Sequence, residues 1–414
     1  MTESSIQYRG WPVVGACFLM SFVGMGFGFY GHSFYMASLT VGLSPSTPKF
    51  AVGTVSTAVT VYYLTAAAIM VFVSDLVAKL GPRLFAAIGA VMMGISLFLV
   101  ASIRDTTDLF IAYLAMAPAF AMLTTAAAAN IVGSWFTEKR GLAMSFALTG
   151  GGVGGFAIVP TLVWLTERFS FEASLRIITA ATIPLLLAAV MICIRRPDTQ
   201  QVTVAATSSV DPSSATMTRR FALASAHYWT IAAPLLLAIM VQVGFIVHQV
   251  SFLLPIVGRE GAGLALFLTA LMAATSRVVV GFFIDRLDQR KLGAMLLASQ
   301  ACALLALLFL PSPLVAYLAS AVFGFAVGVM ITLPSLIIQR ECPPMAFGML
   351  SGLTLAIIQT GNAFGPSLLG WLREATGSYS LPIMICVALE LIAIAVILIR
   401  LGPAVEATSN VGMR

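Results

Sequence analysis

Long apolar stretches alternate with short polar breaks along the whole chain. A transmembrane helix needs about 20 mainly apolar residues, each adding roughly 1.5 Å, and twelve stretches of the 414 residues meet this requirement. They are expected at 11–35, 52–72, 84–101, 109–132, 142–165, 177–193, 229–256, 264–284, 292–310, 315–338, 348–372 and 382–399. The pattern predicts an all-α membrane protein with twelve transmembrane helices and both termini on one side of the bilayer.

The composition indicates that lipid surrounds most of the molecule. Hydrophobic residues make up 60% of the chain and charged residues 9%, a balance that water-soluble domains do not carry. The net charge of +6 is spread as scattered Lys and Arg residues, so nucleic acid is not an expected partner. The sequence has no nucleophile elbow, no His-Glu-x-x-His and no Walker loop, and its five cysteines lack metal-ligand spacing. We therefore expect no enzyme activity, no cofactor and no metal.

The distribution of Lys and Arg predicts the orientation in the membrane. Fifteen of the 22 basic residues fall on the side of the termini, six fall on the other side, and Arg277 lies inside a predicted helix. Because Lys and Arg are enriched on the cytoplasmic side, we expect cytoplasmic termini and a location in the plasma (inner) membrane. Residues 1–10 are polar and lead into the first apolar stretch without a cleavage site, which favours a retained helix over a signal peptide.

A polar stretch divides the chain into two halves of six predicted helices. Its composition of Ser, Thr, Pro and Ala predicts a cytoplasmic linker at 197–226, between bundles at 1–196 and 227–414. The end of this stretch, 219–229, is interpreted either as a short amphipathic surface helix or as plain linker.

Short motifs recur at equivalent places in the two halves. Residues 28–32, Gly-Phe-Tyr-Gly-His, correspond to 244–248, Gly-Phe-Ile-Val-His, and an acidic residue followed by basic residues comes after both helix 2 and helix 8. Such duplication is an architecture of secondary transporters, whose solute site lies between the halves near the middle of the membrane.

The loop after helix 2 carries a family signature. Its residues from Asp75 to Arg83 resemble the loop signature of the major facilitator superfamily, although Val71 replaces the usual leading Gly. The chain resembles this superfamily over essentially its full length, which implies the major facilitator fold and alternating access. In that superfamily the loop braces the inward-closed arrangement, so the resemblance implies a conformational role for Asp75, Arg83 and the equivalent Asp285.

A second set of residues narrows the resemblance. Residues 135–143, Trp-Phe-Thr-Glu-Lys-Arg-Gly-Leu-Ala, and the Gly-rich segment 150–155 resemble the entry to helix 5 in monocarboxylate porters and oxalate/formate antiporters. Those relatives hold a substrate carboxylate with an Arg in helix 8, and Arg277 matches that position. Ala273 replaces an Asp of animal monocarboxylate porters, and Leu355 replaces a Lys of oxalate/formate antiporters. The resemblance thus favours monoanions over dicarboxylates, with no proton route through an acid beside Arg277.

Arg277 is also the main candidate on physical grounds. A charge in the centre of a transmembrane helix costs roughly 2.5–3.5 kcal/mol, and this one lies about 10 Å from the helix end at roughly 1.5 Å per residue. Its planar guanidinium can hold a carboxylate through two charge-assisted hydrogen bonds. The alternative is a structural role, in which Arg277 pairs with helix carbonyls or with another side chain.

Other polar residues are candidates for the same chamber. His32 and His248 occupy equivalent positions, and either imidazole could bind a proton near neutral pH and contact an anion. The alternative is a neutral ring that bonds to a backbone carbonyl. Asn130, Gln249 and Gln359 are further candidates for substrate binding, although amides in membranes often only join helices.

Helix 5 and helix 12 contain two further features. Gly151 and Gly155 belong to a cluster of five glycines that would let helix 5 approach helix 8 closely and slide against it. Glu390 is an acid deep in helix 12, where we interpret it as structural because by resemblance that helix flanks the bundle.

These features predict a secondary active transporter of a small organic anion. The expected substrate is a monocarboxylate held by Arg277, and the expected coupling is to protons through His32 or His248, by alternating access. An organic anion exchanger without proton coupling is the alternative. A drug or metabolite efflux carrier is less favoured, because it predicts an acid in the cavity. The expected partners are the organic anion, protons and the bilayer, and we expect a monomer.

Overall fold

The structure is a computed structural model that describes residues 3–42, 48–133, 135–136, 140–194, 219–281, 283, 286–342 and 347–400. All regular structure among these residues is helical, as the sequence predicts. The first half contains α1 (Glu3–Met25), the π-helix η1 (Gly26–Tyr30), α2 (Gly31–Thr40), α3 (Val52–Met70), α4 (Val73–Leu80), α5 (Pro82–Ala101), α6 (Thr106–Leu123), α7 (Thr125–Gly133), α8 (Arg140–Arg168) and α9 (Phe171–Cys193). The second half contains α11 (Arg219–Ala224), α12 (Ala226–Gly281), α13 (Gln289–Phe309), α14 (Pro313–Met330), α15 (Leu333–Glu341), α16 (Phe347–Thr376) and α17 (Ser380–Ile397).

Helix lengths account for the twelve predicted spans. Ten helices among the described residues are long and apolar enough to cross a membrane. One of them, Ala226–Val280, has 55 residues, which at roughly 1.5 Å per residue is more than twice the hydrocarbon thickness. The chain turns back within it at Gly258, where φ is 71° and ψ is −175°, so this helix supplies two spans. The remaining predicted span corresponds to α16, which is not among the ten apolar helices but, with 30 residues, is long enough to cross the membrane.

Three predicted helices are interrupted in the structure. Helix 1 contains the π-helix η1 between α1 and α2, helix 4 breaks at Thr124, and helix 10 breaks at Ile331 and Thr332. Thr124 adopts an extended conformation, and its hydroxyl donates to the Ala121 carbonyl at 3.1 Å. Helices 4 and 10 hold equivalent places in the two halves, so the interruption is repeated. Discontinuous helices and π-turns are common at binding sites.

The 219–229 segment does form a short helix, α11, before the chain enters α12. The linker proper, 195–218, lies outside the described residues. The boundaries at 196 and 226 therefore stay a prediction.

Pairs of glycines bring two helices into backbone contact within each half. A Cβ atom at Gly150 or Gly154 of α8 would overlap the carbonyl oxygens of Phe18 and Phe22 in α1. A pair in α16 repeats this contact, since Cβ atoms at Gly361 and Gly365 would crowd the Leu236 and Met240 carbonyls of α12. Close backbone approach is how helices associate in lipid without a hydrophobic driving force.

The glycines of α8 also meet other elements. A Cβ at Gly152 would lie 2.9 Å from the Ala274 Cβ, which is the predicted approach to helix 8, and one at Gly155 would lie 2.5 Å from the Tyr30 ring. Gly151 is buried. The prediction named helix 8 as the partner of this cluster, whereas its tightest contacts are with helix 1.

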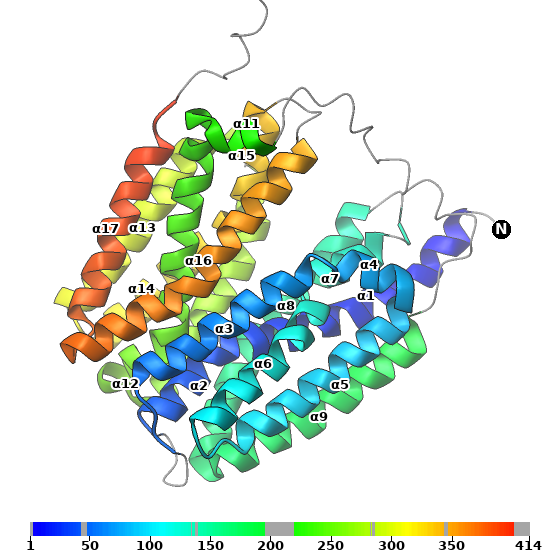
Figure 1. Ribbon diagram of the computed structural model, residues 1–414, viewed down its shortest axis with the longest axis horizontal. Helices are drawn as coiled ribbons and strands as arrows, with labels where there is room; N and C mark the ends of the chain where they lie inside the picture. Colours follow the sequence, from blue (N-terminus) through cyan, green and yellow to red (C-terminus); the bar gives the residue numbers. More distant parts are fainter. Residues whose placement is uncertain are drawn as a thin grey trace, which may run out of the picture.

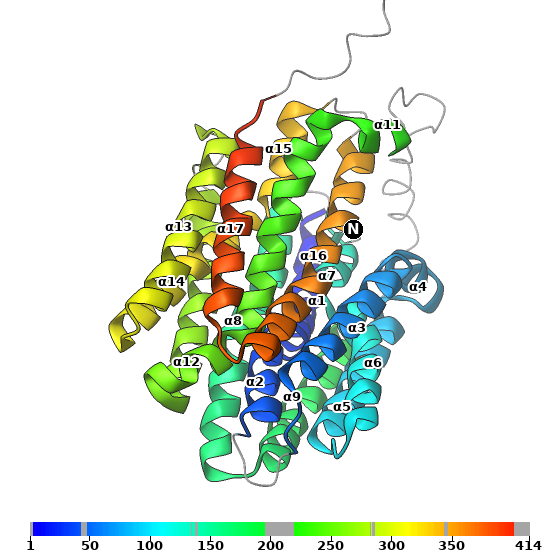
Figure 2. The ribbon, with the colours of Figure 1, turned by 60° about the vertical axis from the view of Figure 1, so that its left-hand side comes forward.

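The two halves meet on one side of the molecule. Figure 1 shows α2 and α3 of the first half crossing α12 and α16 of the second, while the ribbons of the halves diverge toward α4 and α7 on one part and α11 and α15 on the other. Figure 2 shows α13 and α17 side by side on the flank of the second half. The two halves are therefore in contact at the ends of their helices that lie opposite the chain termini.

Candidate functional site

Hydrogen bonds between the halves define the closed side. Val250 N–H donates to Ser33 Oγ at 3.1 Å, Thr60 Oγ1 donates to the Ala363 carbonyl at 2.6 Å, and Gly53 N–H donates to Glu374 Oε2 at 2.7 Å. The Trp371 indole also donates to Thr57 Oγ1 at 3.1 Å. All these contacts join α2 or α3 to α12 or α16, so a solute that reaches the centre from this side has to break them.

His248 is part of this closed contact. Its Nε2 lies 3.1 Å from the Pro366 carbonyl and 3.3 Å from Ser56 Oγ, and its Nδ1 lies 3.1 Å from the Tyr379 hydroxyl. The carbonyl requires a proton on Nε2, so Nδ1 accepts from Tyr379 in a neutral ring. Arg373 lies over the Tyr379 ring at 5.2 Å. In this state His248 joins the halves, and its roles in substrate and proton binding stay predictions.

Arg277 lies in the second part of α12 and is half-buried. Its Nε donates to the Gly328 carbonyl at 3.3 Å, near the end of α14 and just before the break in helix 10. No carboxylate lies within ion-pair distance of Arg277 in the described part of the chain. The Nε atom of the guanidinium is thus hydrogen-bonded, whereas the two outer nitrogens, which form its fork, have no carboxylate partner among the described residues.

The neighbours of Arg277 come from both halves. Ala274, one turn earlier on α12, packs on Gly152 of α8. The buried Tyr30, which ends η1, packs its ring on Gly155, also of α8. Arg277 therefore lies where the glycine-rich helix 5, the π-turn of helix 1 and the broken helix 10 come together.

His32 lies in a cage of tyrosine rings inside the first half. Its ring centroid is 4.5 Å from Tyr62, 5.3 Å from the stacked Tyr113, 5.6 Å from Tyr63 and 5.8 Å from Tyr35. The rings come from α2, α3 and α6. We call these five residues the tyrosine cage.

Most polar atoms of the tyrosine cage have no hydrogen-bond partner in the part of the chain that the structure describes. The Tyr62 hydroxyl donates to the Gly28 carbonyl at 2.5 Å. The hydroxyls of Tyr35, Tyr63 and Tyr113 have no hydrogen-bond partner among the described residues, although all are buried, and the only hydrogen-bonding partner near the His32 ring nitrogens there is the Gly28 carbonyl. Buried polar groups normally find a partner, so the tyrosine cage has the capacity to bind water or a polar group of a ligand.

The three predicted amides occupy different places. Gln249 is buried in the second half and donates to Thr269 Oγ1 at 2.8 Å and Ser320 Oγ at 3.1 Å, so it joins helices there. Gln359 reaches across the halves to the Met70 sulfur at 3.6 Å. Asn130 lies in α7, and its side chain is outside the described part of the chain. A role of any of them in substrate binding stays a prediction.

The predicted loop residues lie at the ends where the ribbons diverge. Asp75 in α4 and Arg83 in α5 are exposed, and neither forms a salt bridge among the described residues. Asp285 lies outside the described residues. Glu390 is fully buried in α17, which packs on α12, α13 and α16 of its own half.

Sequence reasoning missed several residues of this region. The tyrosines of this region, Tyr30, Tyr35, Tyr62, Tyr63 and Tyr113, were not among the residues proposed for the site. One available signal was the concentration of aromatic residues around the repeated motif at 28–32.

Two duplicated helix bundles, discontinuous helices and a membrane-buried Arg at the junction define a membrane transporter. The family model of the Major Facilitator Superfamily matches residues 16–366. The chain therefore belongs to the Major Facilitator Superfamily; it is an integral membrane protein that transports a small molecule, and it is not an enzyme.

Curated relatives point to the branch that the sequence resembles. The chain is 23% identical over 328 residues to "Monocarboxylate transporter 13" of Bos taurus, covering 74% of this chain and 71% of that one. It is 23% identical over 340 residues to "Monocarboxylate transporter 11" of Mus musculus, covering 76% and 71%. A shorter match to "Monocarboxylate transporter 13" of Rattus norvegicus is 28% identical over 112 residues and spans 27% of this chain and 26% of that protein.

Solved structures share the fold. A bacterial homologue of the human lysosomal transporter Spinster, in an inward-facing and occupied conformation, superimposes with a TM-score of 0.75 at 14% identity, covering 96% of this chain and 97% of that one. The nucleoside transporter NupG superimposes with a TM-score of 0.72 at 15% identity, covering 95% and 100%. At these identities the likeness establishes the fold alone.

Proposed function

We propose that this protein is a secondary active carrier of small monocarboxylates that binds the carboxylate at Arg277 and alternates access between the two sides of the membrane. The observation that carries the proposal is the guanidinium at the junction of the halves, which has a backbone carbonyl as its partner and no carboxylate in ion-pair distance among the described residues. An intramembrane charge without a counter-ion is a site for an opposite charge.

The residues at two positions near Arg277 favour a substrate with a single negative charge. Leu355 stands where dicarboxylate carriers of this branch have a Lys, and it is exposed on α16. Ala273 is buried and its carbonyl packs against Gly328, so no acid neutralises Arg277 from that position. The single positive charge of Arg277 is balanced by the single negative charge of one carboxylate, which favours a monoanion as the transported species.

The orientation proposed from Lys and Arg also decides which side of the carrier is open. If the carrier lies in the plasma membrane with its termini in the cytoplasm, the ends of the halves that diverge in Figure 1 face the cytoplasm. The state is then inward-facing, and the hydrogen bonds between α2 or α3 and α12 or α16 close the outer side. We further propose that a single chain is the transporting unit.

Proton coupling is proposed to run through His32. Both nitrogens of His248 are already engaged by neutral groups, whereas His32 has only the Gly28 carbonyl nearby among the described residues, which leaves one ring nitrogen open. Burial opposes a charge on His32, and the ring faces and hydroxyl oxygens of the tyrosine cage would offset part of that cost without a carboxylate. A proton on His32 would add positive charge to the half that faces Arg277.

Replacing His32 with glutamine is expected to remove the stimulation of uptake by external acid. Glutamine keeps hydrogen-bonding groups of similar size but binds no proton near neutral pH. Uptake of a labelled monocarboxylate into proteoliposomes, compared between about pH 5.5 and about pH 7.5, should become independent of pH, while His248→Gln should keep the acid stimulation. Full acid stimulation in His32→Gln together with its loss in His248→Gln would assign the proton to His248 instead.

Anion exchange is the second candidate, because an empty site leaves the Arg277 charge uncompensated, so a bound anion would be required before the site changes the side to which it opens. Counterflow at equal pH on both sides separates the two mechanisms. A proton symporter accumulates substrate in empty vesicles under a pH gradient. An exchanger takes up substrate only when substrate is present inside the vesicles, and the pH gradient does not change its uptake.

A further inference from the structure

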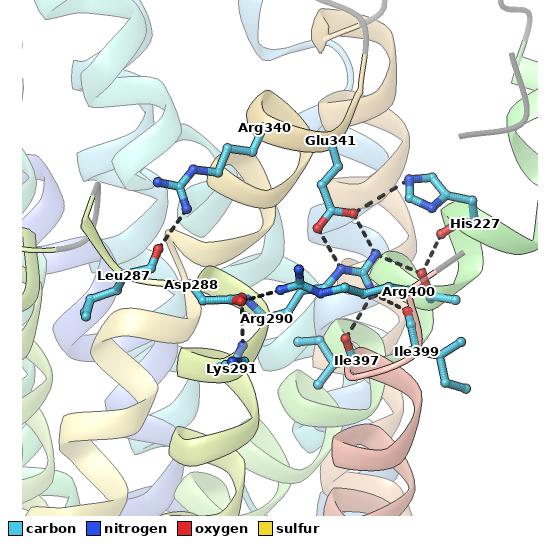
Figure 3. Close-up of polar contacts among 11 residues, drawn as sticks. His227, Leu287, Asp288, Arg290, Lys291, Arg340, Glu341, Ile397, Ile399 and Arg400 are labelled. Atoms are coloured by element: carbon cyan, nitrogen blue, oxygen red, sulfur yellow. Dashed lines mark hydrogen bonds and ion pairs between the residues drawn. The ribbon is translucent and has the colours of Figure 1, made fainter. Parts of the chain in front are cut away.

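A pocket of about 630 Å³ lies at the end of the second half, away from Arg277. It lies where α12 and α13 begin, where α15 ends and where the chain leaves α17 (Figure 3). Its lining contains four arginines, one histidine and two acids: His227, Arg286, Asp288, Arg290, Arg340, Glu341 and Arg400, with Leu287 and Gln289 between them. We call it the basic pocket.

Arg290 forms the floor of the basic pocket and is fully satisfied by the protein. Its Nε and Nη2 donate to the two Glu341 oxygens at 2.7 and 2.8 Å, and its Nη1 donates to the Ile397 and Ile399 carbonyls at 2.9 and 2.7 Å. Figure 3 shows these bonds holding the ends of α15 and α17 to the start of α13. Arg290 and Glu341 therefore hold the basic pocket together, and only the other charged residues of its lining remain to bind a ligand.

Asp288 is engaged as well. Its carboxylate caps α13 by accepting from Arg290 N–H and Lys291 N–H at 3.2 and 3.3 Å, and it pairs with Arg400. Burial works to raise the pKa of Asp288, but these hydrogen bonds and the Arg400 charge outweigh it and hold the pKa below its usual range. Asp288 is thus a carboxylate that is already neutralised inside the basic pocket.

The charges that remain are positive. Four guanidiniums face two carboxylates, and both carboxylates already accept from arginines. Arg286 is exposed, and its side chain has no ion-pair partner among the described residues. Within the described part of the chain the His227 ring nitrogens have no hydrogen bond, although Nε2 lies 3.7 Å from Glu341 Oε2. The basic pocket therefore offers donors and an excess of positive charge, which matches the oxygens of a phosphate group.

Apolar side chains beside the basic pocket favour a lipid as the source of that phosphate. Phe283, Leu287, Leu398 and Ile399 are exposed around the ends of the spanning helices. Trp229, also exposed, donates its indole N–H to the Leu223 carbonyl of α11, and such tryptophans mark the headgroup level of a membrane. A free anion would gain nothing from this apolar rim, whereas acyl chains would cover it.

We propose that the basic pocket binds the phosphate of an anionic phospholipid, with Arg286 and Arg400 as its ligands and the acyl chains along the exposed apolar rim. Basic pockets between transmembrane helices bind anionic headgroups in this way. The bound lipid would tie the loop before α13 to the end of α17, alongside the bonds of Arg290. This site is separate from Arg277 and does not depend on the transported substrate.

Native mass spectrometry of the delipidated full-length protein, titrated with phosphatidylglycerol, phosphatidylcholine or inorganic phosphate, tests the proposal. We expect one tightly retained phosphatidylglycerol and little retention of phosphatidylcholine. Arg286→Gln and Arg400→Gln should each weaken phosphatidylglycerol binding by about fivefold or more, and Arg286→Lys should keep most of the affinity. Arg220→Gln, which removes the same charge from an exposed site on α11, is the matched control and should bind as the unchanged protein does.

Three results would overturn the proposal. Equal weakening by Arg220→Gln would mean diffuse attraction to a basic surface, and unchanged binding in both Arg286→Gln and Arg400→Gln would place the lipid elsewhere. Inorganic phosphate that binds and displaces phosphatidylglycerol at similar concentration would assign the pocket to a soluble anion. Arg286 has no structural partner in the described chain, so its variants are expected to fold.

Discussion

Arg277→Ala is expected to reduce monocarboxylate uptake by about a hundredfold or more, because a carboxylate in the membrane then loses both hydrogen bonds to a charged partner, each worth roughly 1.5–3 kcal/mol. The measurement is initial uptake of a labelled monocarboxylate by proteoliposomes with equal amounts of folded protein. Among the described residues the side chain of Arg277 bonds only to the Gly328 carbonyl, through Nε, so we expect the variant to fold with little loss of thermal stability.

Two further variants make this result specific. Arg277→Lys keeps the charge but loses the planar fork, so we expect uptake between that of the alanine variant and that of the unchanged protein. Arg104→Ala removes an exposed arginine on the closed side and should leave uptake unchanged. Normal uptake in Arg277→Ala would exclude the guanidinium as the substrate ligand, whatever the substrate is.

Gly365→Val is expected to destabilise the folded protein by about 3 kcal/mol, the upper part of the range for overpacking a tight contact. A Cβ at Gly365 would overlap the Met240 carbonyl of α12, which cannot move without breaking the helix. We expect a similar loss for Gly154→Val, where the obstacle is the Phe22 carbonyl of α1. The measurement is thermal unfolding in detergent, followed by size-exclusion chromatography.

Gly352→Val is the matched control for Gly365→Val. Both glycines lie on α16, but a Cβ at Gly352 would meet nothing within 4 Å. We therefore expect that Gly352→Val unfolds close to the temperature of the unchanged protein. If the two variants unfold at the same temperature, close packing of α16 on α12 is not what the glycine pair provides.

The spans could be predicted from the sequence because their length is set by the membrane and each must satisfy its own backbone. The interruptions of the helices could not be predicted in this way. The break at Thr124 involves a local side-chain hydrogen bond, and the π-helix at Gly26–Tyr30 has an apolar composition like that of the helix around it. The approach of α8 to helix 8 at Gly152 was expected, but the closer contact of Gly150 and Gly154 with α1 was not, because composition does not record how a helix is rotated toward its neighbours.

The candidate site was partly predictable for a similar reason. Arg277 stands out because a charge inside an apolar stretch is costly. Arg290 looks like an ordinary loop residue in the sequence, yet it is 1% exposed and holds three chain segments together. The tyrosine cage could not be foreseen, because its members come from α2, α3 and α6 and meet only in the fold.

The central claim is that the outer fork of Arg277 holds the carboxylate of the substrate. Its most direct test is the thermal stability of the purified protein against a panel of small carboxylic acids, because a ligand at about 100 times its Kd raises stability by about 2.7 kcal/mol. We expect at least one monocarboxylate to raise the unfolding temperature of the unchanged protein and of Arg104→Ala but not that of Arg277→Ala. An equal rise in Arg277→Ala would contradict the claim.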